Sequence, residues 1–210
     1  MTHVAIYTSK LGAGLGLPTE TRLLFDLWKP GDSVETLFTR ALESGRFPNI
    51  AASRLKNIIR EVFTPRYIQQ EIPTECLQYL VRVVPTGEMN QLFLLLTARA
   101  NLVLYDFIRQ VYWPFYAAGK STISNEDALR FIDDAIASGK TKSVWSNKVR
   151  RNVAGYLTGC CADYGLLEAG QKTVRQILRV QISPRTSTVL AYDLHFLGLG
   201  DNTLINHPDW

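Results

Sequence analysis

The part of the sequence that most constrains the fold is residues 143–192, where a basic amphipathic stretch precedes two short runs rich in β-branched and aromatic residues. Apolar residues of the first stretch, with Tyr156 among them, recur on one stripe of a helix with about 3.6 residues per turn. The opposite face and its flanks carry amide and cationic side chains: Asn147, Lys148, Arg150 and Arg151. The two later runs, residues 173–182 and 188–196, predict a β-hairpin with Arg185 near its tip. A helix followed by such a wing is common in DNA-binding proteins.

The preceding segment extends this pattern into a helix-turn-helix. Ser124 is a typical N-cap for a helix over residues 124–137, and Gly139 is typical of a helix end. We therefore expect a turn at residues 138–143, followed by the basic helix from residue 144. The further residues expected to contact nucleic acid around this unit are Lys140, Lys142, Ser146, Arg179 and Arg185. The alternative is a solvated surface helix without a ligand, the usual role of a charged helix face.

A second helix-turn-helix is predicted closer to the N-terminus. Ser33 can cap a helix that ends at Gly45, and a basic amphipathic helix follows over residues 48–63, ending before Pro65. The expected contacts are one cation of the turn and the polar face of the second helix: Arg46, Ser53, Arg54, Lys56, Asn57 and Arg60. The same pattern is also typical of an αα-hairpin that binds nothing, so both interpretations stay open.

The positive charge of the chain is concentrated in these two regions. The formal net charge is only +4. Residues 40–70 hold six Lys/Arg against two Glu, and residues 140–188 hold nine Lys/Arg against one Asp and one Glu, so the remainder is acidic. Two basic islands in an otherwise acidic chain favour contact with a polyanion at two places.

The remaining sequence predicts a mainly α protein. Apolar helical patterns cover the centre of the chain, at residues 74–83, 89–105 and 107–116. We expect a helical bundle with the two helix-turn-helix units, the C-terminal one carrying the small β-hairpin wing. A domain boundary is predicted after residue 72, with an N-terminal helical domain over residues 1–72 and a C-terminal domain over residues 73–210.

The hydrophobic tract at residues 92–116 is expected to form a buried helix or helix pair. Arg99, Asp106 and Arg109 interrupt it, so it has no uninterrupted apolar stretch of the ~20 residues that a membrane span needs. Three cysteines, two of them adjacent, form neither a disulfide framework nor a zinc pattern. Because the first ten residues also lack the apolar core of a signal peptide, we expect a cytoplasmic protein that does not contact membranes.

Motifs that resemble those of enzymes do not fit the surrounding sequence. Residues 119–122 and 139–141 resemble the end of a phosphate-binding loop, but Pro114 and Asp134 stand where that motif requires its first glycine. The glycines at residues 12–16 lack the spacing of a dinucleotide-binding motif. The three histidines are far apart in the sequence, so they predict neither a metal site nor a catalytic triad. We expect a non-catalytic protein without a cofactor or metal.

Four stretches carry a family resemblance: residues 7–25 (YTSKLGAGLGLPTETRLLF), 49–67 (NIAASRLKNIIREVFTPRY), 102–114 (LVLYDFIRQVYWP) and 145–168 (WSNKVRRNVAGYLTGCCADYGLLE). In them the chain resembles the BrxA family of the bacteriophage-exclusion (BREX) phage-defence systems. The resemblance implies a small, largely helical, cytoplasmic accessory protein of a multi-gene phage-resistance system that binds double-stranded DNA. The family's fold is also similar to that of the antitermination factor NusB, which binds RNA.

The residues and the resemblance together predict a non-catalytic, monomeric, double-stranded DNA-binding accessory protein. Because Lys and Arg outnumber amide side chains on the two basic faces, we expect weak sequence preference. Two alternatives stay open: a NusB-like RNA-binding protein, and an assembly adaptor that contacts other BREX proteins. RNA binding would be favoured by exposed aromatic rings on which bases stack, whereas most aromatic residues here fall on apolar stripes.

Overall fold

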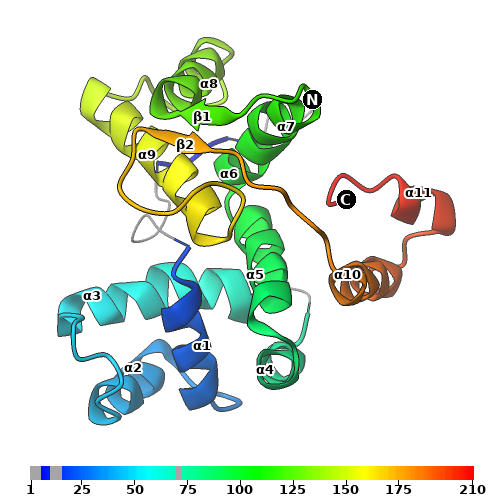
Figure 1. Cartoon of the computed structure of the whole chain (residues 1–210). Coiled ribbons are helices and arrows are strands. Elements are labelled where there is room, and N and C mark those ends of the chain that lie inside the picture. Colours follow the sequence, from blue (N-terminus) through cyan, green and yellow to red (C-terminus); the bar gives the residue numbers. More distant parts are fainter. Residues whose placement is uncertain (1–5, 10–15, 70–71) are drawn as a thin grey trace. The chain divides into compact units, whose positions relative to one another are not determined.

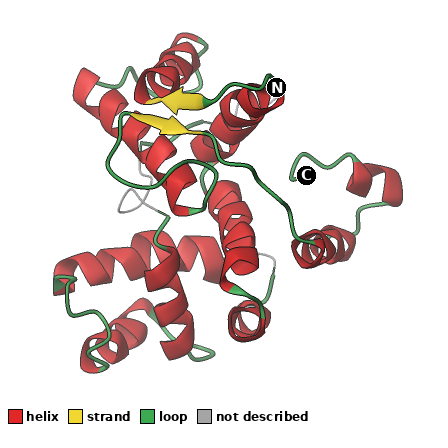
Figure 2. Cartoon of the chain, in the orientation of Figure 1, coloured by secondary structure: helices red, strands yellow, loops and turns green. Residues whose placement is uncertain are grey.

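The structure of the 210-residue chain is a computed structural model, and it describes residues 6–9, 16–69 and 72–210. Figures 1 and 2 show a mainly α protein with a small two-stranded antiparallel sheet, which confirms the predicted fold class.

The described residues form two compact units. The first unit contains the segment up to Pro18 together with Thr97–Val180, and the second contains Thr19–Leu96 together with Gln181–Trp210. The predicted boundary after residue 72 falls inside the second unit. Both units are assembled from segments that are distant in sequence, and local patterns carry no information about such long-range contacts.

The second unit is helical throughout its regular part, with these elements: α1 (Pro18–Leu27), α2 (Val34–Glu43), α3 (Ala52–Asn57), the π-helix η1 (Ile58–Ile68), α4 (Thr74–Val83), most of α5 (Thr86–Ala100), α10 (Pro184–Phe196) and α11 (Asp201–Ile205). Its core includes a cluster of four fully buried aromatic rings from Phe25, Phe63, Tyr67 and Phe93. The Phe25 ring packs edge-on against Phe63 with centroids 4.9 Å apart, packs edge-on against Tyr67 at 5.5 Å, and stacks on Phe93 at 6.0 Å. These contacts fix α1, η1 and α5 against one another.

The helix predicted to end before Pro65 continues through it. α3 passes directly into η1, whose backbone pairing joins residues five positions apart. The Gln69 amide donates to the Thr64 carbonyl oxygen at 3.0 Å, and the Thr64 hydroxyl donates to the Ile59 carbonyl oxygen at 2.9 Å. The wider π-turn accommodates the missing amide of Pro65, and the helix carries the Tyr67 ring into the aromatic core.

The first unit contains the end of α5 and these further elements: α6 (Leu102–Phe107), the π-helix η2 (Ile108–Tyr112), α7 (Trp113–Ala117), β1 (Thr122–Ser124), α8 (Asn125–Ala137), α9 (Asn147–Asp163) and β2 (Val174–Gln176). α8 begins where the sequence predicts. The Asp127 amide donates to Ser124 Oγ at 3.1 Å, and the Ser124 amide donates to the Asp127 carboxylate at 2.8 Å, which is a capping box. Burial alone would raise the pKa of Asp127, but the hydrogen bonds from Ser124 and the charges of Arg130 and Lys120 lower it overall.

The prediction of a hairpin formed by residues 173–182 and 188–196 is wrong. β2 instead pairs antiparallel with β1, and α10 occupies the second predicted strand. Ser183 caps α10, accepting a hydrogen bond from the Thr186 amide at 3.2 Å, and Pro184 lies in the first turn. A Ser-Pro pair is a strong helix start, and here it prevails over the weaker strand preference of β-branched residues.

In the part of the chain that the structure describes, no single helix is both long and apolar enough to cross a membrane. Thr86–Ala100 and Leu102–Ala117 meet that requirement only as a pair, and the pair is bent by 113°.

Candidate nucleic-acid interface

The N-terminal half of α9 presents polar and cationic side chains to solvent. Ser146 caps the helix, its hydroxyl accepting a hydrogen bond from the Val149 amide at 3.4 Å, whereas the C-terminal half is almost entirely buried. Residues three and four apart lie on the same side of a helix. Among the exposed residues on this side are Lys148, Arg151, Asn152 and Tyr156. Neither Lys148 nor Arg151 has an ion-pair partner among the described residues. We call these four residues the α9 face.

The connection between α8 and α9 is longer than an ordinary helix-turn-helix turn. It covers residues 138–146, whereas the turn of that motif has about three to four residues. The prediction that the second helix begins at residue 144 is wrong, because α9 begins at Asn147. Lys142 lies in this connection, exposed and without an ion-pair partner in the described ranges. It therefore adds a free positive charge shortly before the α9 face.

Lys140, which the sequence predicts to contact nucleic acid, belongs to an internal cluster. Its ammonium lies 3.3 Å from the Asp106 carboxylate and 3.3 Å from the Tyr7 hydroxyl. The Tyr7 hydroxyl donates to Asp106 at 2.5 Å, and the Tyr7 amide donates to the Lys140 carbonyl oxygen at 2.7 Å. Burial, followed by the hydrogen bond to Asp106 and its negative charge, raises the pKa of Tyr7. The charge of Lys140 is thus already compensated within its own unit.

Replacing Lys140 with methionine is expected to lower the free energy of unfolding by about 1–2 kcal/mol and to leave nucleic-acid affinity unchanged. Methionine keeps most of the aliphatic chain but leaves the largely buried Asp106 carboxylate without its cation. Urea denaturation followed by circular dichroism measures the effect. Lys142→Met is the matched control, since the exposed Lys142 should be replaceable without loss of stability. Equal stability of the two variants would contradict the role of the cluster.

Arg150 links α9 to α8. Its guanidinium pairs with Asp133 at 2.6 Å and donates to the side-chain oxygen of Asn147. Arg150 is half-buried, whereas Asn147 is exposed. The structure therefore gives Arg150 a positioning role for the start of α9, which the helical wheel of the sequence could not distinguish from a free surface charge.

The two cations predicted on the wing lie in different units. Arg179 follows β2 in the first unit and is exposed, with no ion-pair partner in the described part of the chain. Arg185 lies in the first turn of α10 in the second unit, where it pairs with Glu88 at 3.4 Å. Neither residue is at the tip of a hairpin, so they do not act as one wing.

Most cations of the N-terminal basic region are paired. Arg46 pairs with Asp26 at 3.0 Å, Lys56 with Glu35 at 2.8 Å and Arg60 with Glu61 at 2.8 Å. Arg60 also donates to the Asn57 side chain at 3.2 Å. These pairs are largely exposed and therefore weak, since water and salt screen them. Ser53 and Arg54 are exposed on α3, and Arg54 has no ion-pair partner among the described residues.

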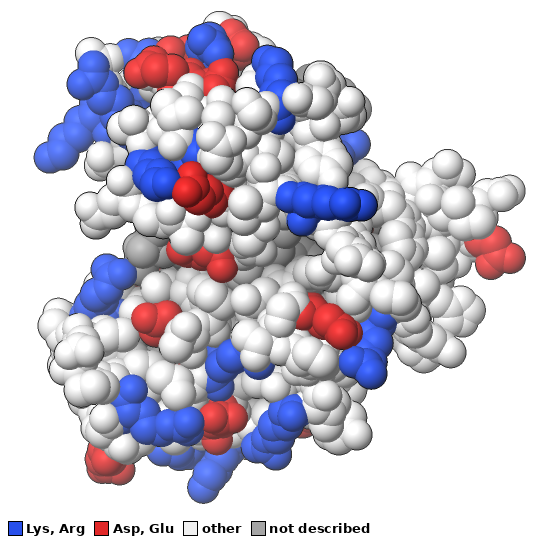
Figure 3. Space-filling view, viewed as in Figure 1, with Lys and Arg blue, Asp and Glu red and all other residues white. Residues whose placement is uncertain are grey.

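The space-filling view shows the same uneven distribution of charge. In Figure 3, Lys and Arg side chains extend from the region where α9 begins, at the upper left, while Asp and Glu gather on α8 beside them. The predicted contacts of the first unit that are exposed and without an ion-pair partner among the described residues are Lys142, Lys148, Arg151 and Arg179. This arrangement suits phosphate contacts by the exposed end of α9.

Two residues of the α9 face were not among the predicted contacts. Asn152 can donate to and accept from a base edge, and the Tyr156 ring, 37% exposed, can contact a base or a sugar. The spacing of Lys148, Asn152 and Tyr156 by four residues places them on one side of the helix and could have revealed them. The sequence places Tyr156 on the apolar stripe of this helix, because the hydropathy pattern does not show which edge of the stripe stays exposed to solvent.

Within residues 6–9, 16–69 and 72–210, no group of three or more His, Cys, Asp or Glu side chains is arranged to hold a metal ion.

Comparison with protein families identifies the chain. The model of the BrxA family matches residues 5–193. The chain belongs to the BrxA family. This BrxA protein is accordingly a BREX-associated defence protein, as the sequence resemblance predicts.

The fold recurs in a solved structure. The BrxA chain is similar to an uncharacterized protein from Magnetospirillum magneticum, known from a crystal structure, with a TM-score of 0.69 and 15% sequence identity over 90% of this chain and 94% of that chain. At this identity the similarity shows a shared fold alone. A search of curated proteins found no match.

Proposed function

We propose that this BrxA protein is a non-catalytic accessory protein that binds double-stranded DNA through the α9 face and the neighbouring Lys142. The observation that carries the proposal is the exposed pair Lys148 and Arg151, which no described acidic residue neutralises. Cations held away from internal partners can replace the counterions of a phosphate backbone, and that exchange is favourable at physiological salt.

The composition of the α9 face supports weak sequence preference. Lys148 and Arg151 suit phosphates, whereas Asn152 is the one amide on that side of the helix. Of two further candidates, Arg150 pairs with Asp133 of α8 and also donates to the Asn147 side chain. A single amide offers little discrimination among base pairs, because a good bidentate contact is worth only about 1–3 kcal/mol.

Binding to duplex DNA is expected to weaken steeply with salt. If Lys142, Lys148, Arg151 and Arg179 each contact one phosphate, the logarithm of the association constant should fall with the logarithm of the salt concentration with a slope of about −3 to −4. Fluorescence anisotropy with a labelled duplex measures this slope, and a duplex of scrambled sequence should bind within about threefold of the first. A salt-independent association constant would contradict the proposal.

A second candidate is binding to RNA or single strands, and the exposed ring of Tyr156 favours it. Tyr156 lies one helical turn from Asn152, so an unpaired base could stack on the ring while the amide contacts its edge. Competition separates the two candidates. Under the duplex proposal, unlabelled duplex displaces labelled duplex at lower concentration than a matched single strand or RNA hairpin does.

A further inference from the structure

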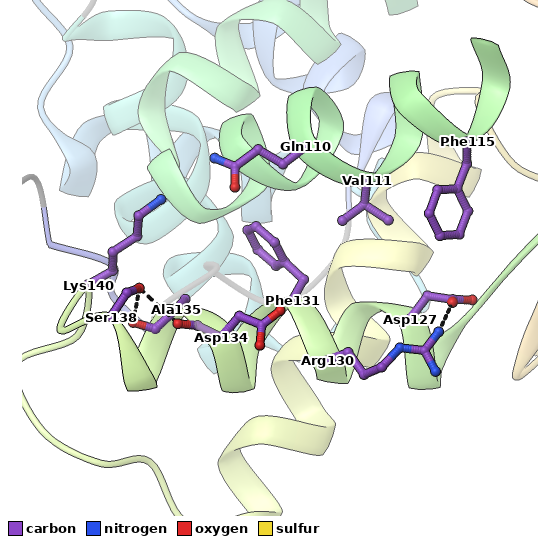
Figure 4. Close-up of a pocket in the computed structure, with 10 residues that line it drawn as sticks. All are labelled: Gln110, Val111, Phe115, Asp127, Arg130, Phe131, Asp134, Ala135, Ser138 and Lys140. Carbon is purple, nitrogen blue, oxygen red and sulfur yellow. Dashed lines mark hydrogen bonds and ion pairs between the residues drawn. The ribbon is translucent and has the colours of Figure 1, made fainter. Parts of the chain in front are cut away.

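The first unit contains a pocket that has no part in the proposed binding of double-stranded DNA. It lies between α8 and the continuous η2–α7 segment and has a volume of about 280 Å³. Figure 4 shows Gln110 and Val111 on the η2 wall, and Phe131 and Asp134 on the α8 wall.

The floor of the pocket is apolar and held rigidly. Val111, Phe131 and Ala135 are nearly buried, and the half-buried Phe115 closes one end. Phe131 is fixed from behind by the ring of Phe107, with centroids 5.6 Å apart. An apolar cavity of ~150 Å³ can hold a benzene ring. The present volume therefore suits a flat two-ring group but not a drug-sized molecule, whose pockets are usually about 300–1,000 Å³.

Two polar side chains on opposite walls are free to bind a ligand. The Gln110 amide and the Asp134 carboxylate are exposed, and neither side chain has a partner among the described residues. The other polar groups of the pocket are engaged: Asp127 with Ser124 and Arg130, Ser138 with two backbone carbonyls, and Lys140 with Asp106 and Tyr7. The pocket thus offers one carboxylate that only accepts hydrogen bonds and one amide that both donates and accepts.

Cations border the pocket at both ends. Arg130 lies at one end with 71% of its side chain exposed, and its pair with Asp127 leaves further N–H groups available. Lys140 lies at the other end, where Asp106 and Tyr7 already hold its ammonium, so Arg130 is the available cation (Figure 4). A ligand held on the apolar floor would therefore have donors within reach for an attached phosphate.

We propose that this pocket binds one unpaired nucleobase with its phosphate, and that guanine is preferred. The apolar floor accepts the flat ring, Gln110 and Asp134 contact its edges, and Arg130 contacts the phosphate. Guanine has two neighbouring N–H groups on its pairing edge, which match the two oxygens of an unpaired carboxylate. The source is either a free nucleotide or an unpaired residue of a strand.

The test uses GMP and AMP as probes of the full-length protein in isothermal titration calorimetry. GMP should bind at least about tenfold more tightly than AMP, and Asp134→Asn should remove that difference, because one acceptor oxygen becomes a donor. Glu126→Gln is the matched control: it makes the same change on an exposed carboxylate of α8 outside the pocket. Absence of GMP binding at millimolar concentration, or equal GMP affinity of Asp134→Asn and wild type, would overturn the proposal.

Two further experiments identify where the bound base comes from and distinguish this pocket from the α9 face. A DNA hairpin with one unpaired guanine is compared with the same hairpin carrying an abasic residue there. A difference that disappears in Asp134→Asn assigns the pocket to strands, and GMP binding without that difference assigns it to free nucleotides. Lys148→Ala/Arg151→Ala should keep GMP affinity, and Asp134→Asn should keep duplex affinity, so the two proposals fail independently.

Discussion

Replacing Lys148 and Arg151 together with alanine is expected to weaken duplex DNA binding by about one to two orders of magnitude at low salt. Each lost phosphate contact removes one released counterion, so the salt slope should become shallower by about 2. Both side chains are exposed and without ion-pair partners among the described residues, so the melting temperature should not change appreciably. Anisotropy titrations at several salt concentrations and differential scanning calorimetry measure the two effects.

The control for this variant is Lys29→Ala/Arg82→Ala. It removes the same number of positive charges from exposed positions in the second unit, outside both basic helices. If binding depended only on net charge, the two double variants would lose equal affinity. The proposal requires the loss to be specific to the α9 face, and equal losses would remove that face from the interface.

Replacing Phe25 with alanine is expected to destabilise the second unit by about 3–5 kcal/mol. Its side chain is fully buried and contacts three other aromatic rings from two helices, so truncation leaves a cavity that the rigid rings cannot fill. Denaturant unfolding measures the loss. Hydrogen exchange should show reduced protection in α1, η1 and the part of α5 within this unit.

Phe196→Ala makes the same change at a side chain that is 81% exposed, and its free energy of unfolding should stay within about 0.5 kcal/mol of wild type. Comparable losses for the two variants would mean that the aromatic cluster is not the core of the second unit. Uniform loss of protection across the first unit in Phe25→Ala would argue against two separate cores.

Local signals in the sequence were reliable for the helices. Ser33 and Ser124 cap α2 and α8 as predicted, and α4 covers the predicted residues 74–83. A cap acts through hydrogen bonds to backbone groups two or three residues away, so a short sequence window contains all the information it needs. Where two local signals disagreed, at Ser183-Pro184 before a β-branched run, the strand prediction was wrong and the helix formed.

The candidate interface was predicted less completely than the helices. The positions of the basic regions follow from the sequence, but it could not show that Arg150 pairs with Asp133 while Arg151, the next residue, stays free. Neighbouring residues on a helix point in directions about 100° apart, and only the packing of α8 decides which direction meets a carboxylate.

Sequence alone determined that this BrxA chain is mainly helical, where most helices begin, and that its positive charge is concentrated in two regions. These properties depend on hydrogen bonds and periodicity within a few residues. Only the tertiary structure decided that β2 pairs with β1, that Lys140 joins Tyr7 and Asp106, and that the α9 face keeps free cations. Each of these depends on segments that are distant in the chain and that folding brings next to one another.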